Sequence, residues 1–148
     1  MARLQGVAGR IAIVAIAALV LAGCGGSSRK DDEKQIAATL KTFFRDLADG
    51  DAAGACGALT AHGRETLFQA KTPAACEATV KKVTSRSGAA AIRTRRELRG
   101  ARILTVVWKT DDRANVDVQL PSSNAPTAPF QVLRRGDGWA INGPVTPA

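Results

Sequence analysis

The sequence predicts an α+β domain in which a group of helices precedes an antiparallel sheet. In the first half of the chain, apolar residues recur every three or four positions, which is the spacing of one buried helix face. After Ser87 and Gly88 the spacing becomes two, which is the period of a strand with one buried face. Helices followed by a run of strands are typical of the α+β class.

The longest predicted helix starts at Asp32, which is placed to cap it, with Gln35 reaching back as in a capping box. Gly50 suits the left-handed residue that ends a helix. We expect one face of this helix to be buried, because its apolar residues form a single stripe. The stripe consists of Ile36, Leu40, Phe43, Phe44 and Leu47.

Three shorter helices are predicted next. Asp51, Thr60 and Thr72 are each expected to cap one of them, and Pro73 suits the first position of the last. The residues expected to face inward are Cys56 and Leu59 in the first, Leu67 and Phe68 in the second, and Cys76, Val80 and Val83 in the third.

Five strands are predicted over residues 92–99, 103–109, 115–120, 130–133 and 139–141. In the first of them, Ile92, Thr94, Arg96 and Leu98 alternate with Arg93, Arg95, Glu97 and Arg99. In the third, Val116, Val118 and Leu120 share one face, and Asn115, Asp117 and Gln119 share the other. Gly136-Asp137-Gly138 is typical of a hairpin turn between the last two.

Residues 1–23 have the composition of a secretory signal. Arg3 and Arg10 precede an apolar run from Ile11 to Ala22, which fits a signal peptide and is too short for a stable membrane-spanning helix. The run closes on Leu21-Ala22-Gly23-Cys24, which resembles the lipobox of bacterial lipoproteins. The resemblance implies that Cys24 receives a diacylglycerol, that the chain is cut just before it, and that the new amino terminus is then acylated. An ordinary signal peptide cut elsewhere, or an uncleaved anchor, is the alternative.

The mature chain is expected to lie on the extracytoplasmic face of the cell membrane. Residues 24–30 are predicted to be a flexible tether, because Gly25-Gly26-Ser27-Ser28 offers no side chain worth burying, and residues 31–148 form one domain. With Cys24 lipidated, Cys56 and Cys76 remain as an even pair in an oxidising compartment and are expected to form a disulfide. A metal site or a redox couple is the alternative, for which only His62 could assist.

The order of these elements resembles the NTF2-like superfamily, a cone-shaped α+β fold shared by SnoaL-like polyketide cyclases, ketosteroid isomerases and many small secreted lipoproteins. The sequence is most similar to actinobacterial lipoproteins. The resemblance implies N-terminal helices packed on a curved antiparallel sheet, with a pocket between the sheet and the first helix, but no particular activity. It rests on Phe43-Phe44-Arg45-Asp46-Leu47-Ala48-Asp49-Gly50-Asp51, on Cys56 and Cys76 around Leu59-Thr60, and on Gly136-Asp137-Gly138-Trp139-Ala140-Ile141.

An enzyme of this superfamily would need a carboxylate base and a donor for the developing oxyanion. The chain has no tyrosine, and its sole histidine, His62, is expected to face solvent. Asp117 is the best candidate base, yet its alternation with Val116 and Val118 predicts that it points to water. The carboxylates assigned to the predicted sheet and its turns are Glu97, Asp111, Asp112, Asp117 and Asp137.

Basic residues outnumber acidic ones, with 21 Lys and Arg against 13 Asp and Glu and a formal net charge of +8. Outside the cell this favours anionic lipid headgroups or acidic wall polymers, and nucleic acid is not an expected partner. One arginine cluster either grips an acidic partner or keeps a strand from pairing with another chain. It consists of Arg93, Arg95, Arg96, Arg99 and Arg102.

Two further motifs have plain structural interpretations. Arg135-Gly136-Asp137 matches an integrin-binding tripeptide but also fills a hairpin turn with suitable residues. Trp108 and Trp139 are expected in the core. We therefore expect a lipid-anchored binding or accessory domain without catalysis, cofactor or metal, whose partners are the membrane through Cys24 and a small apolar ligand or an envelope protein. The alternatives are a small-molecule enzyme of the cyclase or isomerase type and an interaction module of an envelope complex.

Replacing Cys24 with Ala should release the protein from membranes and delay removal of the signal, because the thiol is the acyl acceptor in the implied pathway. Membrane and soluble fractions of cells expressing the parent and the Cys24→Ala protein measure this. If the variant fractionates with membranes as the parent does, the lipid anchor is wrong.

Overall fold

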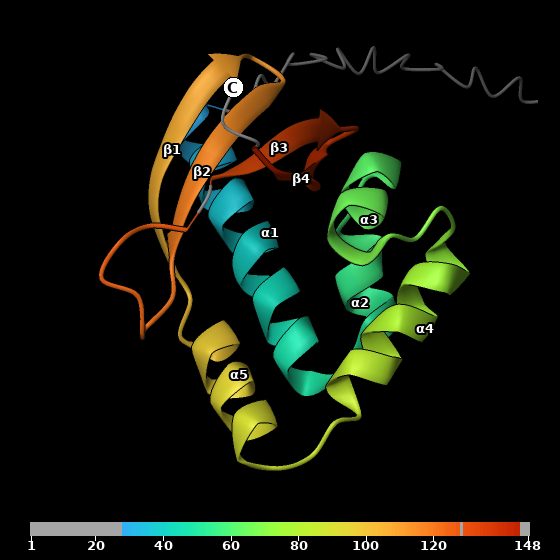
Figure 1. The fold of residues 1–148 in the computed structure, drawn as a ribbon. Coiled ribbons are helices and arrows are strands. Elements are labelled where there is room, and N and C mark those ends of the chain that lie inside the picture. The colour runs from blue at the N-terminus through green and yellow to red at the C-terminus, as the bar shows by residue number, and fades with distance from the viewer. Residues whose placement is uncertain (1–27, 128, 146–148) are drawn as a thin grey trace, which may run out of the picture.

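The computed structural model describes residues 28–127 and 129–145. In these residues the helices are α1 (Arg29–Asp49), α2 (Ala52–Gly57), α3 (Ala61–Phe68), α4 (Pro73–Thr84) and α5 (Ala89–Arg99). The strands are β1 (Arg102–Thr110), β2 (Arg113–Gln119), β3 (Phe130–Arg135) and β4 (Gly138–Pro144). The fold is α+β, as predicted, with every helix ahead of the sheet (Figure 1).

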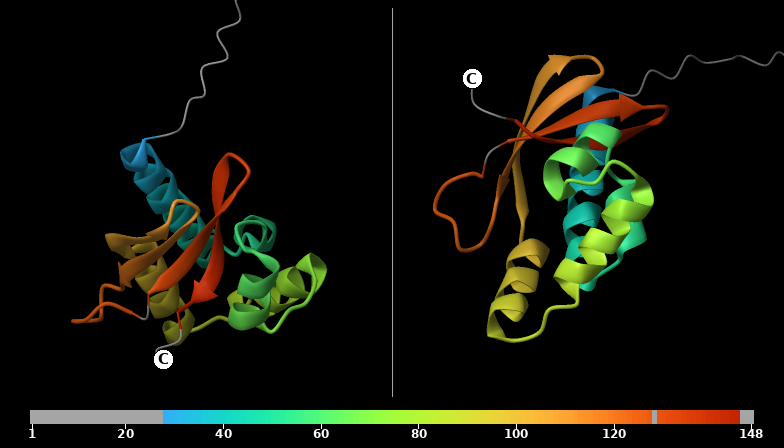
Figure 2. Two further views of the ribbon diagram at one scale, coloured as in Figure 1. Left: turned by 90° about the horizontal axis from the view of Figure 1, so that it is seen from above. Right: turned by 45° about the vertical axis from the view of Figure 1, so that its right-hand side comes forward.

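The four strands form one antiparallel meander in the order β1-β2-β3-β4. The sheet bends over α1, while α2, α3 and α4 lie on the other side of that helix, and α5 lies beside its C-terminal half (Figures 1 and 2). Side chains fill the space between α1 and the sheet: Phe43 is 2% exposed, and Val116, Val118, Val132 and Ile141 are 0% exposed. The inner face of the sheet is therefore packed against α1.

The described residues contain a core of their own. Their buried cluster runs from Ile36 on α1 to Ile141 on β4. We therefore expect the segment from residue 28 onward to fold by itself. Cys24 and the predicted signal lie outside the described residues. No helix in the described ranges is long and apolar enough to cross a membrane.

The start of α1 differs from the prediction. Ser28 is the N-cap, and its side chain accepts a hydrogen bond from the backbone N–H of Asp31, so Asp32 does not cap the helix. The sequence contains the reason, since Ser28 and Asp31 stand three residues apart, the spacing of a capping box. Arg29 and Lys30, predicted to belong to the flexible tether, are helical.

Asp32 instead connects the N-terminal end of α1 to strand β3. Its side chain is buried, and it accepts a hydrogen bond of 2.6 Å from the guanidinium of Arg134 on β3. That guanidinium lies 4.6 Å from the ring centre of Trp139, which in turn meets Trp108 edge to face at 5.5 Å. Trp139 is buried and Trp108 half-buried, so both belong to the packed interior, as expected.

The predicted strand over residues 92–99 is wrong, because this segment forms α5. The run Ala89-Ala90-Ala91 and the following Arg, Glu and Leu residues are strong helix formers. Of the half-buried residues of α5, Ala91, Arg95 and Leu98 fall at i, i+4 and i+7, which is one helix face, and Glu97 lies next to that face. Arg93, Arg96 and Arg99 are exposed on this helix, and the described sheet has four strands.

The predicted caps of the other helices are confirmed. The side chains of Asp51, Thr60 and Thr72 accept hydrogen bonds from backbone N–H groups at the starts of α2, α3 and α4, and Pro73 occupies the first turn of α4. Gly50 ends α1 with φ at 79°, in the left-handed region. One residue predicted to face inward is not buried: Val83, near the end of α4, is 49% exposed.

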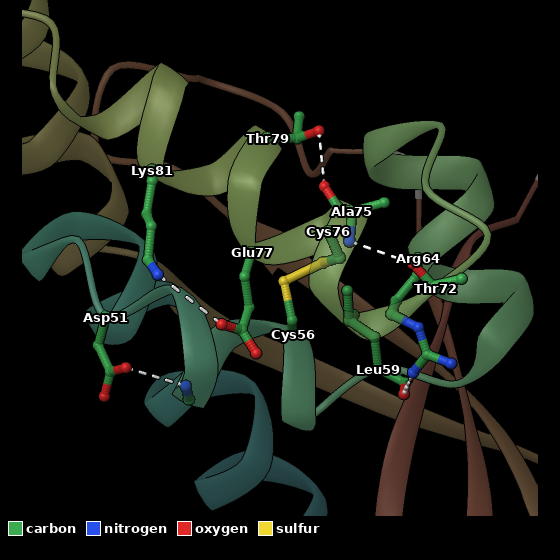
Figure 3. Close-up of a disulfide and its surroundings, with 11 residues drawn as sticks. Asp51, Cys56, Leu59, Arg64, Thr72, Ala75, Cys76, Glu77, Thr79 and Lys81 are labelled. Carbon is green, nitrogen blue, oxygen red and sulfur yellow. Dashed lines mark hydrogen bonds and ion pairs between the residues drawn. A yellow bond between two sulfur atoms is a disulfide. The ribbon is translucent and has the colours of Figure 1, made fainter.

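The predicted disulfide is confirmed. Cys56 on α2 is joined to Cys76 on α4, with their Cα atoms 6.0 Å apart and both side chains buried (Figure 3). An ion pair of 3.8 Å between Lys81 and Glu77 lies on the neighbouring turn of α4. The bridge fixes the position of α4 relative to the helices that pack on α1.

Replacing both Cys56 and Cys76 with Ala should lower the free energy of unfolding by about 3 kcal/mol, because the bridge closes a loop of about twenty residues in the unfolded chain. Urea unfolding of the segment from residue 28 onward measures this. The parent under reducing conditions is the control and should unfold at a similarly lowered urea concentration. An unchanged midpoint in both samples would show that the bridge matters little.

Replacing Val118 with Asp should lower the free energy of unfolding by about 3 kcal/mol or more, because it places a charge in the packed space between β2 and α1. Asp117→Asn is the matched control, one residue away on the outer face of the sheet, and should change stability by no more than about 0.5 kcal/mol. Urea midpoints compare the two, and equal effects would contradict the assignment of faces.

Candidate ligand-binding site

An apolar pocket of about 310 Å³ lies between α4 and α5. The connection between these two helices is at the end of the domain opposite the start of α1 (Figure 1). This volume is at the lower end of the range for small-molecule sites. Its walls come from four helices, with Leu47 of α1, Phe68 of α3, Val83 of α4, and Ala91 and Leu98 of α5 among the lining residues. The partial exposure of Val83 is explained by this hollow.

The sequence of α5 leaves this space open. The helix has no fully buried residue, and it turns the small side chains of Ala90, Ala91 and Thr94 toward the pocket. Gly88, with φ at 103°, allows the chain to reverse between α4 and α5 without bringing the two helices into close packing. Larger residues at these positions would fill the hollow.

Arg95 holds the connection between α4 and α5 in place. Its Nη2 donates to the backbone oxygens of Thr84 at 2.8 Å and Arg86 at 3.1 Å. Because these carbonyls belong to the end of α4 and the segment after it, the guanidinium fixes one rim of the pocket. Arg95 also lines a shallow groove on the outer side of α5, together with Ile92, Arg96 and Arg99.

Several arginines lie around this rim. Within the described part of the chain, an ion pair of 2.6 Å joins Arg99 to Asp49, and the ion pairs found there include none from Arg93, Arg95 or Arg96. The predicted arginine cluster therefore exists, but on a helix rather than a strand. Its last member, Arg102, begins β1 and donates to Gln119 at 3.0 Å.

Glu97 is the carboxylate of α5, not of the sheet. It accepts hydrogen bonds from the hydroxyl of Ser122 at 2.7 Å and from the backbone N–H of Ser122 at 2.8 Å. These bonds, above all that from the hydroxyl, hold the pKa of Glu97 below its ordinary value, and the charges of Arg93 and Arg96 lower it further. Glu97 thus anchors the loop after β2 to α5.

The other predicted candidates lie away from the pocket. Asp117 is on the outer face of β2, Asp111 and Asp112 form the turn between β1 and β2, and Asp137 is in the turn between β3 and β4. The hydroxyl of Thr110 holds the pKa of Asp112 below its ordinary value.

His62 is exposed on α3, and Gly136, with φ at 59°, makes Arg135-Gly136-Asp137 a turn segment as predicted. Within the described residues, no three His, Cys, Asp or Glu side chains are grouped so as to hold a metal ion.

Sequence periodicity does not reveal the residues that form the pocket, because it predicts a strand where α5 lies. The alanine run after Gly88 is the sequence signal that places them on a helix. Beside the apolar residues, the lining includes Thr84, Ser87 and Thr94 and the arginines Arg86 and Arg95. The hydroxyls of Thr84 and Thr94 donate to backbone oxygens of their own helices. Such a lining can enclose a short apolar chain and donate hydrogen bonds at its mouth.

No protein-family model matches the chain, and no curated protein does. A solved structure from Nostoc punctiforme, described as a domain of unknown function with a cystatin-like fold, is similar to it at 19% sequence identity. The TM-score is 0.44, and the likeness covers 78% of this chain and 76% of that one.

Proposed function

We propose that this chain is a lipid-anchored, extracytoplasmic binding domain of the NTF2-like type, without a catalytic step of its own. The lipobox at Leu21-Ala22-Gly23-Cys24 supports the anchor. The order of elements supports the NTF2-like type, since the long helix α1 and the shorter helices come first and an antiparallel meander bends over α1. Membership of that superfamily would by itself assign no activity.

The observation that carries the binding role is the apolar pocket between α4 and α5. The resemblance to NTF2-like proteins implies a pocket between the sheet and the first helix, but Val116, Val118 and Val132 fill that space. The hollow lies instead near the C-terminal end of α1, with Leu47 contributing to its wall. A small apolar ligand there would gain about 0.8 kcal/mol for each methylene it buries.

An interaction module of an envelope complex is the second candidate. It is supported by the exposed arginines of α5, such as Arg93 and Arg96, and by the filled interior of the sheet. An acidic partner would meet this surface through screened attraction, which falls with salt. The pocket next to the arginines favours the ligand-binding role, because a charged docking surface alone needs no hollow.

Replacing Ala91 with Phe should lower the affinity for a neutral apolar probe at least about tenfold, because the phenyl ring occupies the pocket that the probe would enter. Fluorescence titration with N-phenyl-1-naphthylamine, using the segment from residue 28 onward, measures this affinity.

Ala89→Phe is the matched control, since Ala89 is exposed on the same helix and is not among the lining residues. It should bind the probe as the parent does. Circular dichroism and the melting temperature establish that each variant is folded. Absence of binding by the parent, or equal binding by the two folded variants, would count against the pocket.

A further inference from the structure

Arg95 connects the apolar pocket to the arginine groove of α5, since it lines both. A guanidinium carries five N–H donors, and the two bonds to Thr84 and Arg86 use two of them. Among the described residues, Nε and Nη1 of Arg95 make no hydrogen bond, and Arg95 makes no ion pair. A half-buried cation with remaining donors therefore stands at the mouth of an apolar hollow.

The charged residues that line the pocket and the groove are all arginines. Arg86 lines the pocket itself, and Arg96 lies in the adjoining groove. The acidic groups nearby are already engaged, because Asp49 pairs with Arg99 and Glu97 accepts two hydrogen bonds from Ser122. An anionic group at this place would meet guanidinium donors without displacing a carboxylate.

We infer that the site takes a single-chain carboxylate, with the alkyl chain in the pocket and the carboxylate at Arg95 and Arg86. This rests on the proposed ligand-binding role and adds the chemistry of the ligand. A volume of about 310 Å³ suits a chain of medium length better than a lipid with two acyl chains. Burial of the chain supplies most of the affinity, and the charge-assisted hydrogen bonds of the headgroup select acids over neutral molecules.

The test compares octanoate with octanol, which differ in the headgroup and share the apolar chain. Both are used to displace N-phenyl-1-naphthylamine from the segment from residue 28 onward. Octanoate should bind about tenfold more tightly at low salt, as expected for a hydrogen bond to a charged group. The difference should shrink as salt is added, because the arginines are partly exposed.

Arg86→Gln removes one charge at the mouth while leaving the backbone oxygen of residue 86 for Arg95. It should weaken octanoate several-fold and leave octanol within about twofold. Arg95→Gln should remove most of the preference for the acid, and its melting temperature reports whether the connection between α4 and α5 is kept. Arg93→Gln is the matched control, since Arg93 is exposed on α5 and lines neither hollow, and it should bind both ligands as the parent does.

The outcomes separate the two proposals. Equal binding of octanoate and octanol by the parent, or a preference that survives in both Arg86→Gln and Arg95→Gln, would overturn the acidic ligand while the apolar pocket stands. Binding of neither molecule would overturn the pocket as a ligand site, and the arginines of α5 would then be better explained as a surface for an acidic protein.

Discussion

The fold depends on the burial of one face of α1 beneath a sheet that bends over it. Ile36, Leu40 and Phe43 are almost completely removed from water, and the inner residues of β2, β3 and β4 pack directly on them. Each large apolar side chain buried in this way contributes about 1.5 to 3 kcal/mol. Because the inner residues of the sheet are buried against α1, the candidate pocket lies elsewhere, among the helices around the C-terminal end of α1.

The N-terminal end of α1 is held in place by polar and aromatic contacts rather than by aliphatic packing. The buried carboxylate of Asp32 pairs with the guanidinium of Arg134, and this guanidinium lies over the ring of Trp139. A buried pair of this kind adds little net stability, but loss of one partner leaves an uncompensated charge. The contact therefore specifies how α1 is oriented under the sheet. It joins residues about one hundred positions apart in sequence, so no local pattern could reveal it.

Most helices could be predicted because caps and apolar stripes are local signals. Asp51, Thr60, Thr72 and Gly50 each occupy the position that their chemistry favours. The disulfide could also be predicted, because it follows from cysteine usage rather than from geometry. Periodicity alone does not settle the segment 89–99, since Ile92 and Leu98 fit one strand face, whereas Ala91, Arg95 and Leu98 fit one helix face. There the helix propensity of the alanines decided the outcome, and the pocket was missed with it.

The length of α1 separates the first described residues from the pocket. Its 21 residues span about 30 Å, and the hollow between α4 and α5 includes Leu47, which lies near the C-terminal end of the helix. If Cys24 carries the proposed lipid, the attachment point precedes the N-terminal end of α1, and the hollow lies near the other end of that helix. A ligand could then enter and leave the hollow from the aqueous side while the anchor stays in the bilayer.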